Sequence, residues 1–266
     1  MACASHDATP RHQRVVARML SKAGLDEDAL RCGVTPPMDE QEQARIALGL
    51  KPTSQIQCEC SGEHAGMVAA CKHLGYPLES YNAPDHPLQQ WLRQIVAEVT
   101  RVPEGEIVLG TDGCSIPTFG VPIRTFAIAY AALADPQRLP DGAGRRYAGS
   151  LNRLRDAMGA HPDMIAGDGN LDTDLMRLTS GKLVAKLGAE GVLCIGVPER
   201  GLGIAIVMDD GSTRGQGPAT VAVLEQLELA DAQTLAKIRE QHSDGVKNFA
   251  GKTVGELRPA FTLEMH

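Results

Sequence analysis

The chain has 266 residues, of which 43% are hydrophobic and 22% are charged. This composition supports a substantial buried core and excludes a disordered protein. The formal net charge is -7, and no run of Lys and Arg supplies a basic face. Because phosphate contacts require such a face, the sequence argues against a nucleic-acid-binding protein. No apolar run reaches the length of about 18 residues needed to cross a membrane.

Neither the N-terminal residues nor the cysteines indicate secretion. The first residues, MACASHDATPRHQ, lack the basic region and the apolar stretch of a signal peptide. The sequence has seven cysteines, an odd number, without a dense disulfide pattern. We therefore expect a cytoplasmic protein whose cysteines are core residues, metal ligands or nucleophiles.

The first half of the sequence predicts mainly helices. Thr9 and Pro10 form a helix start, and Gly24 ends the apolar pattern that follows. From Pro87 onward, apolar residues recur at the spacing of one buried helical face. A buried strand is then expected at 106–112, and it runs into a loop. The helices expected in this half lie at 10–23, 26–32, 39–48, 61–75, from Pro87 onward, and around 126–133.

The second half predicts an antiparallel sheet followed by helices. The stretch 135–146 is rich in Pro and Gly and is expected to be an exposed loop. The segments KLVAKLG, GVLCIGVPE and LGIAIVMDDG are separated by short turns, which predicts a three-stranded meander. Helices at 218–229 and 231–241 and a last strand near 258–264 are expected to follow. The predicted fold class is α+β, with an antiparallel sheet flanked by helices.

Cysteines and carboxylates form one candidate site. Cys60 and Glu63 are three residues apart, so they share one side of a helix that starts at Ser61. Cys114 follows the predicted strand in a Gly-rich loop that also contains Asp112. Two thiolates with carboxylates suit zinc. The spacing matches no standard zinc motif, however, and ordinary buried cysteines are the alternative.

A lysine and a serine form a second candidate site. Lys186 lies inside the apolar strand LVAKLG, where a lysine usually faces solvent. The alternative is an inward-facing lysine that acts in its neutral form as a base toward a serine. Gly188 follows it, and a Lys-x-Gly arrangement is used by penicillin-binding proteins and β-lactamases. Taken alone, Ser5 is better explained as part of a frayed terminus than as a catalytic residue, and Asp112 as a turn cap.

Several blocks of the sequence together resemble the L-asparaginase II family, the rhizobial-type asparaginases with serine–lysine chemistry and a zinc site. CSGEHAGMVAACKHLG resembles the Cys-Ser-Gly-Lys-His-Ala-Gly-Met block of that family, and ACASH resembles its Cys-Ala-Ser-His piece. The blocks that follow in the family's order are DHPLQQ, TDGCSIPTFGVPIRTFAIAYAAL, HPDMIAG, DTDLM and KLGAEGV. The resemblance extends over essentially the whole chain.

The resemblance implies a single domain over residues 1–266, with a fold like that of serine β-lactamases and glutaminases. It implies hydrolysis of L-asparagine to L-aspartate and ammonia by a homodimer. The charge and the hydropathy described above predict no nucleic-acid or membrane partner. The residues that it assigns are Ser5 and Lys186 for catalysis, Asp112, Gly113 and Glu190 for substrate binding, and Cys60, Glu63 and Cys114 for zinc.

The sequence also departs from the family pattern. The family has a Ser-x-x-Lys at a helix start upstream of ACASH, and no serine of this sequence has a lysine three positions later. We therefore expect an N-terminally truncated member. Glu63 stands where the family has a lysine ligand, and a carboxylate is the more conventional zinc ligand. Asp7, Val207 and Gly215 differ from the family's usual residues in ways that affect the substrate rim more than the fold.

Two functions from different classes follow from these observations. The first is an amidohydrolase that uses Ser5 and Lys186, with activity impaired by the absence of the Ser-x-x-Lys. The second is a non-catalytic, metal-binding fragment or pseudoenzyme of the same family. A sheet that lacks N-terminal strands would have an unpaired edge, so poor solubility or an oligomer that covers the edge is expected.

Overall fold

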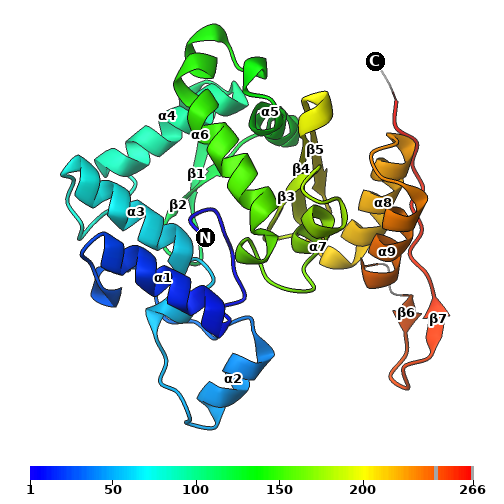
Figure 1. Cartoon of the computed structure of the whole chain (residues 1–266), viewed down its shortest axis with the longest axis horizontal. Coiled ribbons are helices and arrows are strands. Elements are labelled where there is room, and N and C mark those ends of the chain that lie inside the picture. The colour runs from blue at the N-terminus through cyan, green and yellow to red at the C-terminus, as the bar shows by residue number, and fades with distance from the viewer. Residues whose placement is uncertain (243–244, 265–266) are drawn as a thin grey trace. The chain divides into compact units, whose positions relative to one another are not determined.

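The structure is a computed structural model that describes residues 1–242 and 245–264, without the side chain of Asp141. The chain divides into two compact units, Met1–Thr125 with Asp163–Gly167, and Phe126–Pro162 with Asp168–His266. Figure 1 labels the helices and strands of both units. Helices and small antiparallel sheets make up the chain, which confirms the predicted α+β class at that level.

Helices α1 and α3 pack against each other in the first unit (Figure 1). The N-cap residue of α1 (Pro10–Lys22) is Thr9, as predicted, and Val16 and Leu20 are buried on its inner face. Helix α3 (Ser61–Leu74) ends at Gly75, whose φ of 71° lies in the left-handed region that glycine favours. The remaining helical elements are η1 (Glu27–Ala29), α2 (Glu40–Ala47), η2 (Gln55–Gln57), α4 (Pro87–Thr100), η3 (Glu104–Glu106) and η5 (Pro162–Met164).

The core of the first unit is built largely from aliphatic residues and sulfur. Val16 and Leu20 of α1 meet Val68 of α3 and Leu88 of α4 in one buried cluster. Buried cysteines belong to the same cluster, and they are Cys32, Cys58, Cys60, Cys71 and Cys114. The prediction that the cysteines include core residues is therefore confirmed for this unit.

A two-stranded ribbon closes the first unit in chain order. Strands β1 (Val108–Thr111) and β2 (Pro117–Gly120) pair antiparallel, with Thr111 opposite Pro117. The strand predicted at 106–112 exists, but the prediction that it is buried is wrong. All of β1 is exposed, and Val108 is 69% exposed. The predicted loop also contains β2, which the sequence did not indicate, because Pro and Gly at both ends of so short a strand resemble turn residues.

The second unit is centred on the predicted meander. Strands β3 (Val184–Gly188), β4 (Val192–Val197) and β5 (Leu202–Val207) form a sheet in the order β3-β4-β5. Lys186 lies opposite Cys194, and Cys194 lies opposite Ala205. Since directly opposed residues point to the same face of an antiparallel sheet, these three side chains share one face.

Helices surround this sheet, and two of them were not predicted. The packing against β3 comes mainly from α7 (Leu171–Leu178). Helix α6 (Asp141–Ala160) begins inside the stretch expected to be an exposed loop, because Pro140 and the following glycines form its start. The sequence pattern that indicates this helix begins after its first turn. It consists of apolar and aromatic residues at helical spacing, namely Tyr147, Leu151, Leu154 and Met158. The other helices are α5 (Ile123–Ala134), η4 (Pro136–Arg138), η6 (Pro198–Arg200), η7 (Thr213–Gly215), α8 (Gln216–Gln226) and α9 (Ala232–His242).

The C-terminal part differs from the prediction. Strands β6 (Val246–Lys247) and β7 (Thr253–Gly255) form a small hairpin, whereas the described part of the predicted strand near 258–264 has no regular structure. Across the described residues, no helix combines the length and apolar composition needed to cross a bilayer.

Close packing of β5 on α5 gives a stability prediction. A Cβ atom added at Gly203 would lie 1.8 Å from the carbonyl oxygen of Ala127, so the helix has to move for any larger residue. We expect Gly203→Ala to lower the free energy of unfolding by roughly 1–3 kcal/mol, the usual cost of overpacking. Urea denaturation followed by circular dichroism measures this change.

The matched control is a glycine with open space around it. Gly149 lies inside α6, and a Cβ there meets nothing within 4 Å. Gly149→Ala is therefore expected to stabilise the protein by roughly 0.5–1 kcal/mol, because alanine is the better helix former. Equal effects of the two substitutions would refute the packing argument.

Candidate functional site

The segment that carries Ser5 is held in place by backbone hydrogen bonds. His6 donates its amide to the carbonyl of Glu59 at 3.1 Å, and Asp7 donates to the carbonyl of Ala166 at 2.7 Å. Asp7 in turn accepts from the amide of Asp39 at 2.8 Å. Ser5 is exposed at the start of this anchored stretch. The structure therefore contradicts the reading of this segment as a frayed terminus.

Two glycines of α3 make room for the first residues of the chain. A Cβ at Gly62 would lie 2.7 Å from the carbonyl oxygen of Met1, and one at Gly66 would lie 2.9 Å from the Cβ of Ala2. Because they are four residues apart, both glycines lie on one face of the helix. Part of the SGEHAG motif thus serves to position the segment before Ser5.

His6 anchors the same segment through its side chain. Its Nδ1 atom accepts from the amide of Ala8 at 3.0 Å, so the proton of the neutral ring is on Nε2. Nε2 then donates to Ser61 Oγ at 3.0 Å, and Ser61 Oγ donates to the carbonyl of Ile56 at 2.9 Å. Burial, followed by the influence of His12, lowers the pKa of His6 to about 3. The native contacts therefore require a neutral ring.

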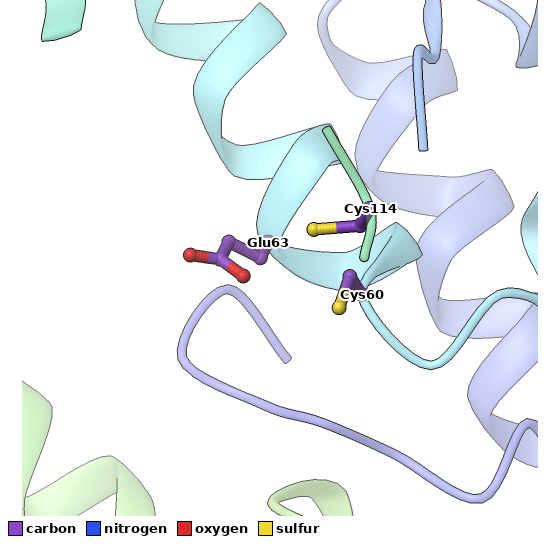
Figure 2. Close-up of side chains that lie close together, drawn as sticks. All are labelled: Cys60, Glu63 and Cys114. Atoms are coloured by element: carbon purple, nitrogen blue, oxygen red, sulfur yellow. The ribbon is translucent and has the colours of Figure 1, made fainter. Parts of the chain in front are cut away.

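The predicted metal ligands come together in the first unit. Cys60 precedes α3, Glu63 lies in the first turn of that helix, and Cys114 lies in the turn between β1 and β2. The sulfur atoms and a carboxylate oxygen are all within 4.8 Å of one another. Figure 2 shows the side chains of Cys60, Glu63 and Cys114 close together at the start of α3. Both cysteines are buried and Glu63 is half-buried, so this group can hold a metal ion.

A tight turn presents Cys114 to this group. The amide of Asp112 donates to the carbonyl of Ile116 at 2.8 Å, and the amide of Ser115 donates to the carbonyl of Asp112 at 2.9 Å. Ser115 has a φ of 73°, which is unusual for a residue with a side chain. Asp112 and Gly113 are exposed on the same turn.

The pKa values of the two candidate sulfur ligands are shifted in opposite directions. The hydrogen bond with Cys114, a second one with Cys58 and burial all raise the pKa of Cys60. The hydrogen bond from Cys60, together with one from His64, lowers the pKa of Cys114 despite its burial. Of the two candidate sulfur ligands, Cys114 is therefore the one whose surroundings favour the thiolate, the form that coordinates a metal strongly.

Two further cysteines extend this network. Sequence reasoning singled out the Cys-x-Cys segment that begins at Cys58 but gave Cys58 no role, and it did not consider Cys32. Cys58 forms side-chain hydrogen bonds with Cys32 and Cys60, which lower its pKa. Its sulfur also lies 3.8 Å from the carbonyl oxygen of Cys32. Cys32 donates to the carbonyl of Gln55 at 3.4 Å. Only the Cys-x-Cys spacing of Cys58 and Cys60 could have indicated this continuation in the sequence.

Lys186 lies half-buried on β3 in the second unit. Its Nζ donates to the carbonyl of Leu187 at 2.5 Å. The buried thiol of Cys194 is directly opposite on β4, and burial raises its pKa to about 12 against the effect of the Lys186 charge. The structure therefore places Lys186 between the solvated and the inward arrangement, and its role as a base stays a prediction.

Asp172 on α7 is a site residue that sequence reasoning missed. Its carboxylate is completely buried and accepts from the amides of Thr173 at 2.8 Å and Leu187 at 3.0 Å. Burial raises the pKa of Asp172, and the Leu187 amide and the Lys186 charge oppose that shift. The carboxylate thus fixes β3 directly beside Lys186. The DTDLM motif was noted, but nothing in it distinguishes this carboxylate from Asp174.

The predicted residues are distributed over both units. Cys60, Glu63 and Cys114 form one group in the first unit, and Asp112 and Gly113 share the turn of Cys114. In the second unit, Glu190 is exposed in the turn after β3, with a φ of 56°. Ser5 belongs to the first unit and Lys186 to the second, so their action as a pair remains a prediction.

A comparison with protein families gives one clear result. A family model described as L-asparaginase II matches residues 1–259. A search of curated proteins found no match.

The buried ring of His6 predicts a pH dependence of stability. The pKa falls from 6.5 in the unfolded chain to about 3 in the folded protein. Stability is therefore complete above about pH 6.5 and declines as the pH falls toward 3, because the unfolded state binds the proton first. At about 1.4 kcal/mol per pH unit, the largest possible loss is about 5 kcal/mol.

Denaturation curves between pH 4 and 8 measure this effect. In His6→Gln, which keeps an amide donor toward Ser61 but does not titrate, the decline should be shallower than in the wild type. His73 is exposed on α3, so His73→Gln should retain the wild-type profile. A His6→Gln profile parallel to that of the wild type would show that His6 does not cause the acid sensitivity.

Proposed function

We propose that this chain, which belongs to the L-asparaginase II family, is an amidohydrolase that converts L-asparagine and water to L-aspartate and ammonia. The observation that carries the proposal is the family match over residues 1–259. Membership supports an amidohydrolase acting on an amide substrate. The choice of asparagine and the assignment of roles to individual residues are our proposals.

The proposed chemistry uses Ser5 and Lys186. The hydroxyl of Ser5 attacks the side-chain amide carbon, and an acyl-enzyme forms as ammonia leaves. A neutral Lys186 takes the serine proton and returns it to the departing nitrogen, and water then releases aspartate. Support comes from the exposure of Ser5 on an anchored segment and from the fixed position of β3 beside Lys186.

Substrate binding is assigned to Asp112, Gly113 and Glu190. The two carboxylates are exposed, so they are available to attract the α-ammonium group of an amino acid. Gly113 offers a backbone amide without a side chain, and amides of this kind stabilise a developing oxyanion. These assignments rest on the resemblance and on exposure.

Three broader features belong to the same proposal. The fold is that of serine β-lactamases and glutaminases, and residues 1–266 act as one asparaginase-type domain. The chain works as a homodimer in the cytoplasm. The three-stranded antiparallel meander with its covering helices supports the first of these features.

The proposed ion at Cys60, Glu63 and Cys114 is zinc. Zinc binds thiolates at ~2.3 Å and carboxylates at ~2.0 Å, so donors within 4.8 Å of one another need only small adjustments. When bound, the ion ties the start of α3 to the turn between β1 and β2, and it adds positive charge there. No step of the proposed hydrolysis uses this ion.

A second function is favoured by one specific observation. No serine among residues 1–266 has a lysine three positions later, although the resemblance implies such a pair in catalysis. A non-catalytic, metal-binding member of the family would need no such pair. The activity of the purified chain distinguishes this alternative from slow hydrolysis.

The activity test is ammonia release from L-asparagine. We expect slow turnover, below about 1 per second, against a typical enzyme value of about 10 per second. Ser5→Ala and Lys186→Met should each lower this rate by a further ~10²–10⁴-fold, the range for loss of acid–base chemistry. Lys182 is exposed shortly before β3, so Lys182→Met serves as the matched control and should leave the rate unchanged.

Each result of this test has one interpretation. No ammonia release above the uncatalysed background from the wild type favours the non-catalytic alternative. A rate near the typical enzyme value contradicts the proposed impairment. A rate that depends on neither Ser5 nor Lys186 removes the proposed serine–lysine pair.

Metal binding is tested with zinc alone. We expect one zinc ion per chain, and Cys60→Ala and Cys114→Ala should weaken binding by at least ~100-fold, because each removes a thiolate ligand. Cys71 is equally buried in α3 but lies outside the ligand group, so Cys71→Ala should retain the wild-type affinity. Competition with a chromophoric chelator measures all four proteins, and equal affinities would exclude this site.

A further inference from the structure

The β6–β7 hairpin of the second unit exposes its apolar side chains. Every residue from 246 to 262 is exposed. At the tip of the hairpin, Phe249 is fully exposed (115%), and Val254 on β7 is 60% exposed. An isolated two-stranded hairpin is at best marginally stable in water, and aromatic side chains are major contributors to the energetics of interfaces. The hairpin therefore has the composition of a segment that packs against another surface.

Hydrogen bonds within the turn hold Phe249 in this exposed position. The amide of Asn248 donates to the carbonyl of Lys252 at 3.0 Å, and its side-chain Oδ1 accepts from the amides of Ala250 at 3.1 Å and Lys252 at 3.0 Å. Gly251 closes the turn by donating to the carbonyl of Asn248 at 2.9 Å, with a φ of 75° that glycine adopts readily. The exposure of Phe249 is therefore a property of a formed turn.

The segment that follows the hairpin is tied to its own unit. Gln226, the last residue of α8, donates its Nε2 to the carbonyl of Phe261 at 3.3 Å and accepts with Oε1 from the amide of Leu263 at 2.8 Å. In Figure 1 the strands β6 and β7 lie beyond the helices α8 and α9, in the red part of the chain. The hairpin is thus a projection that is anchored at its far end.

Helix α2 of the first unit borders an apolar groove. Within this fully described helix, the one buried residue is Glu42. The aliphatic residues of α2 instead line a cavity of about 630 Å³, together with residues 34–37. A volume of roughly 300–1,000 Å³ is usual for a pocket that receives a ligand. The apolar residues of the lining are Val34, Pro36, Pro37, Ala44, Ile46 and Ala47.

The hairpin and the groove carry charges of opposite sign. Lys247 and Lys252 flank the exposed tip of the hairpin, whereas the charged residue that lines the groove is Glu40. Arg45 also lies on α2, but it forms an ion pair with Glu42 at 3.4 Å. The chain as a whole has a formal net charge of -7, so a basic hairpin is attracted to a second copy of the chain. Such complementarity steers encounter and selects partners.

We propose that the groove formed by α2 and residues 34–37 receives the β6–β7 hairpin of a second copy of this chain, with Phe249 inserted into the cavity. One copy carries both surfaces, so a reciprocal exchange between two copies covers both hairpins and closes as a two-fold dimer. The inference gives a contact surface to the homodimer proposed above and rests on that part of the proposed function. It does not depend on hydrolysis.

Removal of the aromatic anchor tests the hairpin side of the contact. Each dimer would lose two buried Phe side chains in Phe249→Ser, so we expect its dissociation constant to rise at least ~100-fold. Sedimentation velocity over a range of protein concentrations measures this change. Phe249 is exposed in the folded chain, so the circular dichroism spectrum should be unchanged. Val108 is an exposed apolar residue of the other two-stranded ribbon, so Val108→Ser is the matched control and should keep the wild-type dissociation constant.

A pair of lysine substitutions on α2 tests the groove side. Ala44 and Gln41 are both exposed on this helix, and Ala44 lines the cavity whereas Gln41 does not. Lysine is a good helix former, so neither substitution should unfold α2. Ala44→Lys fills the groove and repels the lysines of the hairpin, and we expect at least ~10-fold weaker dimerisation. Gln41→Lys adds the same charge outside the groove and should dimerise like the wild type.

A photoreactive residue at the tip identifies what the hairpin binds. Phe249→benzoylphenylalanine is prepared with and without a nitrogen isotope label, and the two forms are mixed before irradiation. We expect mass spectrometry to find cross-links from the tip to residues 34–53, in peptide pairs that combine a labelled and an unlabelled chain. Such mixed pairs arise only between two copies.

The inference is overturned if the wild-type chain stays monomeric, or if every cross-link joins equally labelled peptides or reaches a surface other than the groove. A dimer that keeps its wild-type strength in both Phe249→Ser and Ala44→Lys also overturns it, although the homodimer itself would stand. Ammonia release is measured separately on the same proteins, so failure of this contact and failure of the proposed hydrolysis can be told apart.

Discussion

The first unit depends on five consecutive residues, Cys60–His64, at the start of α3. One helical turn points successive side chains in different directions, so each of these residues meets a different part of the chain. Ser61 bonds to His6, Gly62 admits the first residue, and His64 bonds to Tyr81, while Cys60 and Glu63 face Cys114. The segment that carries Ser5, the metal ligands and the core are thereby tied to one helix start, and a change at any of these positions affects all three.

The second unit contains an analogous constraint around a buried charge. A buried carboxylate is unfavourable unless it is hydrogen-bonded, and Asp172 satisfies this condition with the amides of Thr173 and Leu187. Its hydrogen bond to β3 is made at the residue that follows Lys186, so stability and placement of the lysine depend on the same contact.

The features that depend on neighbouring residues in the sequence could be predicted. The start of α1 at Thr9, the end of α3 at Gly75 and the three strands of the meander all follow from capping residues, glycine and alternation. Helix α6 was missed because its first turn carries glycines, and the anchoring of Ser5 was missed because its partners are Glu59 and Ala166. Within the site, Cys60 and Glu63 could be paired from their spacing, whereas Cys114 could be grouped with them only by residue type, and the resemblance then assigned it as a ligand. Asp172 and Tyr81 act through partners far along the chain, and no pattern in the sequence encodes such contacts.

The charge of the candidate ligand group indicates what a metal would do at this site. The resemblance places a lysine at the position of Glu63, so two thiols and a carboxylate would surround an ion here instead of two thiols and an amine. The start of α3 contributes positive helix-dipole charge at Cys60 and Glu63, which offsets part of the added negative charge. Negatively charged ligands reduce the ability of zinc to polarise a substrate or a water molecule. A site rich in such ligands is suited to holding α3 and the Cys114 turn together, so the proposed hydrolysis would not require the ion.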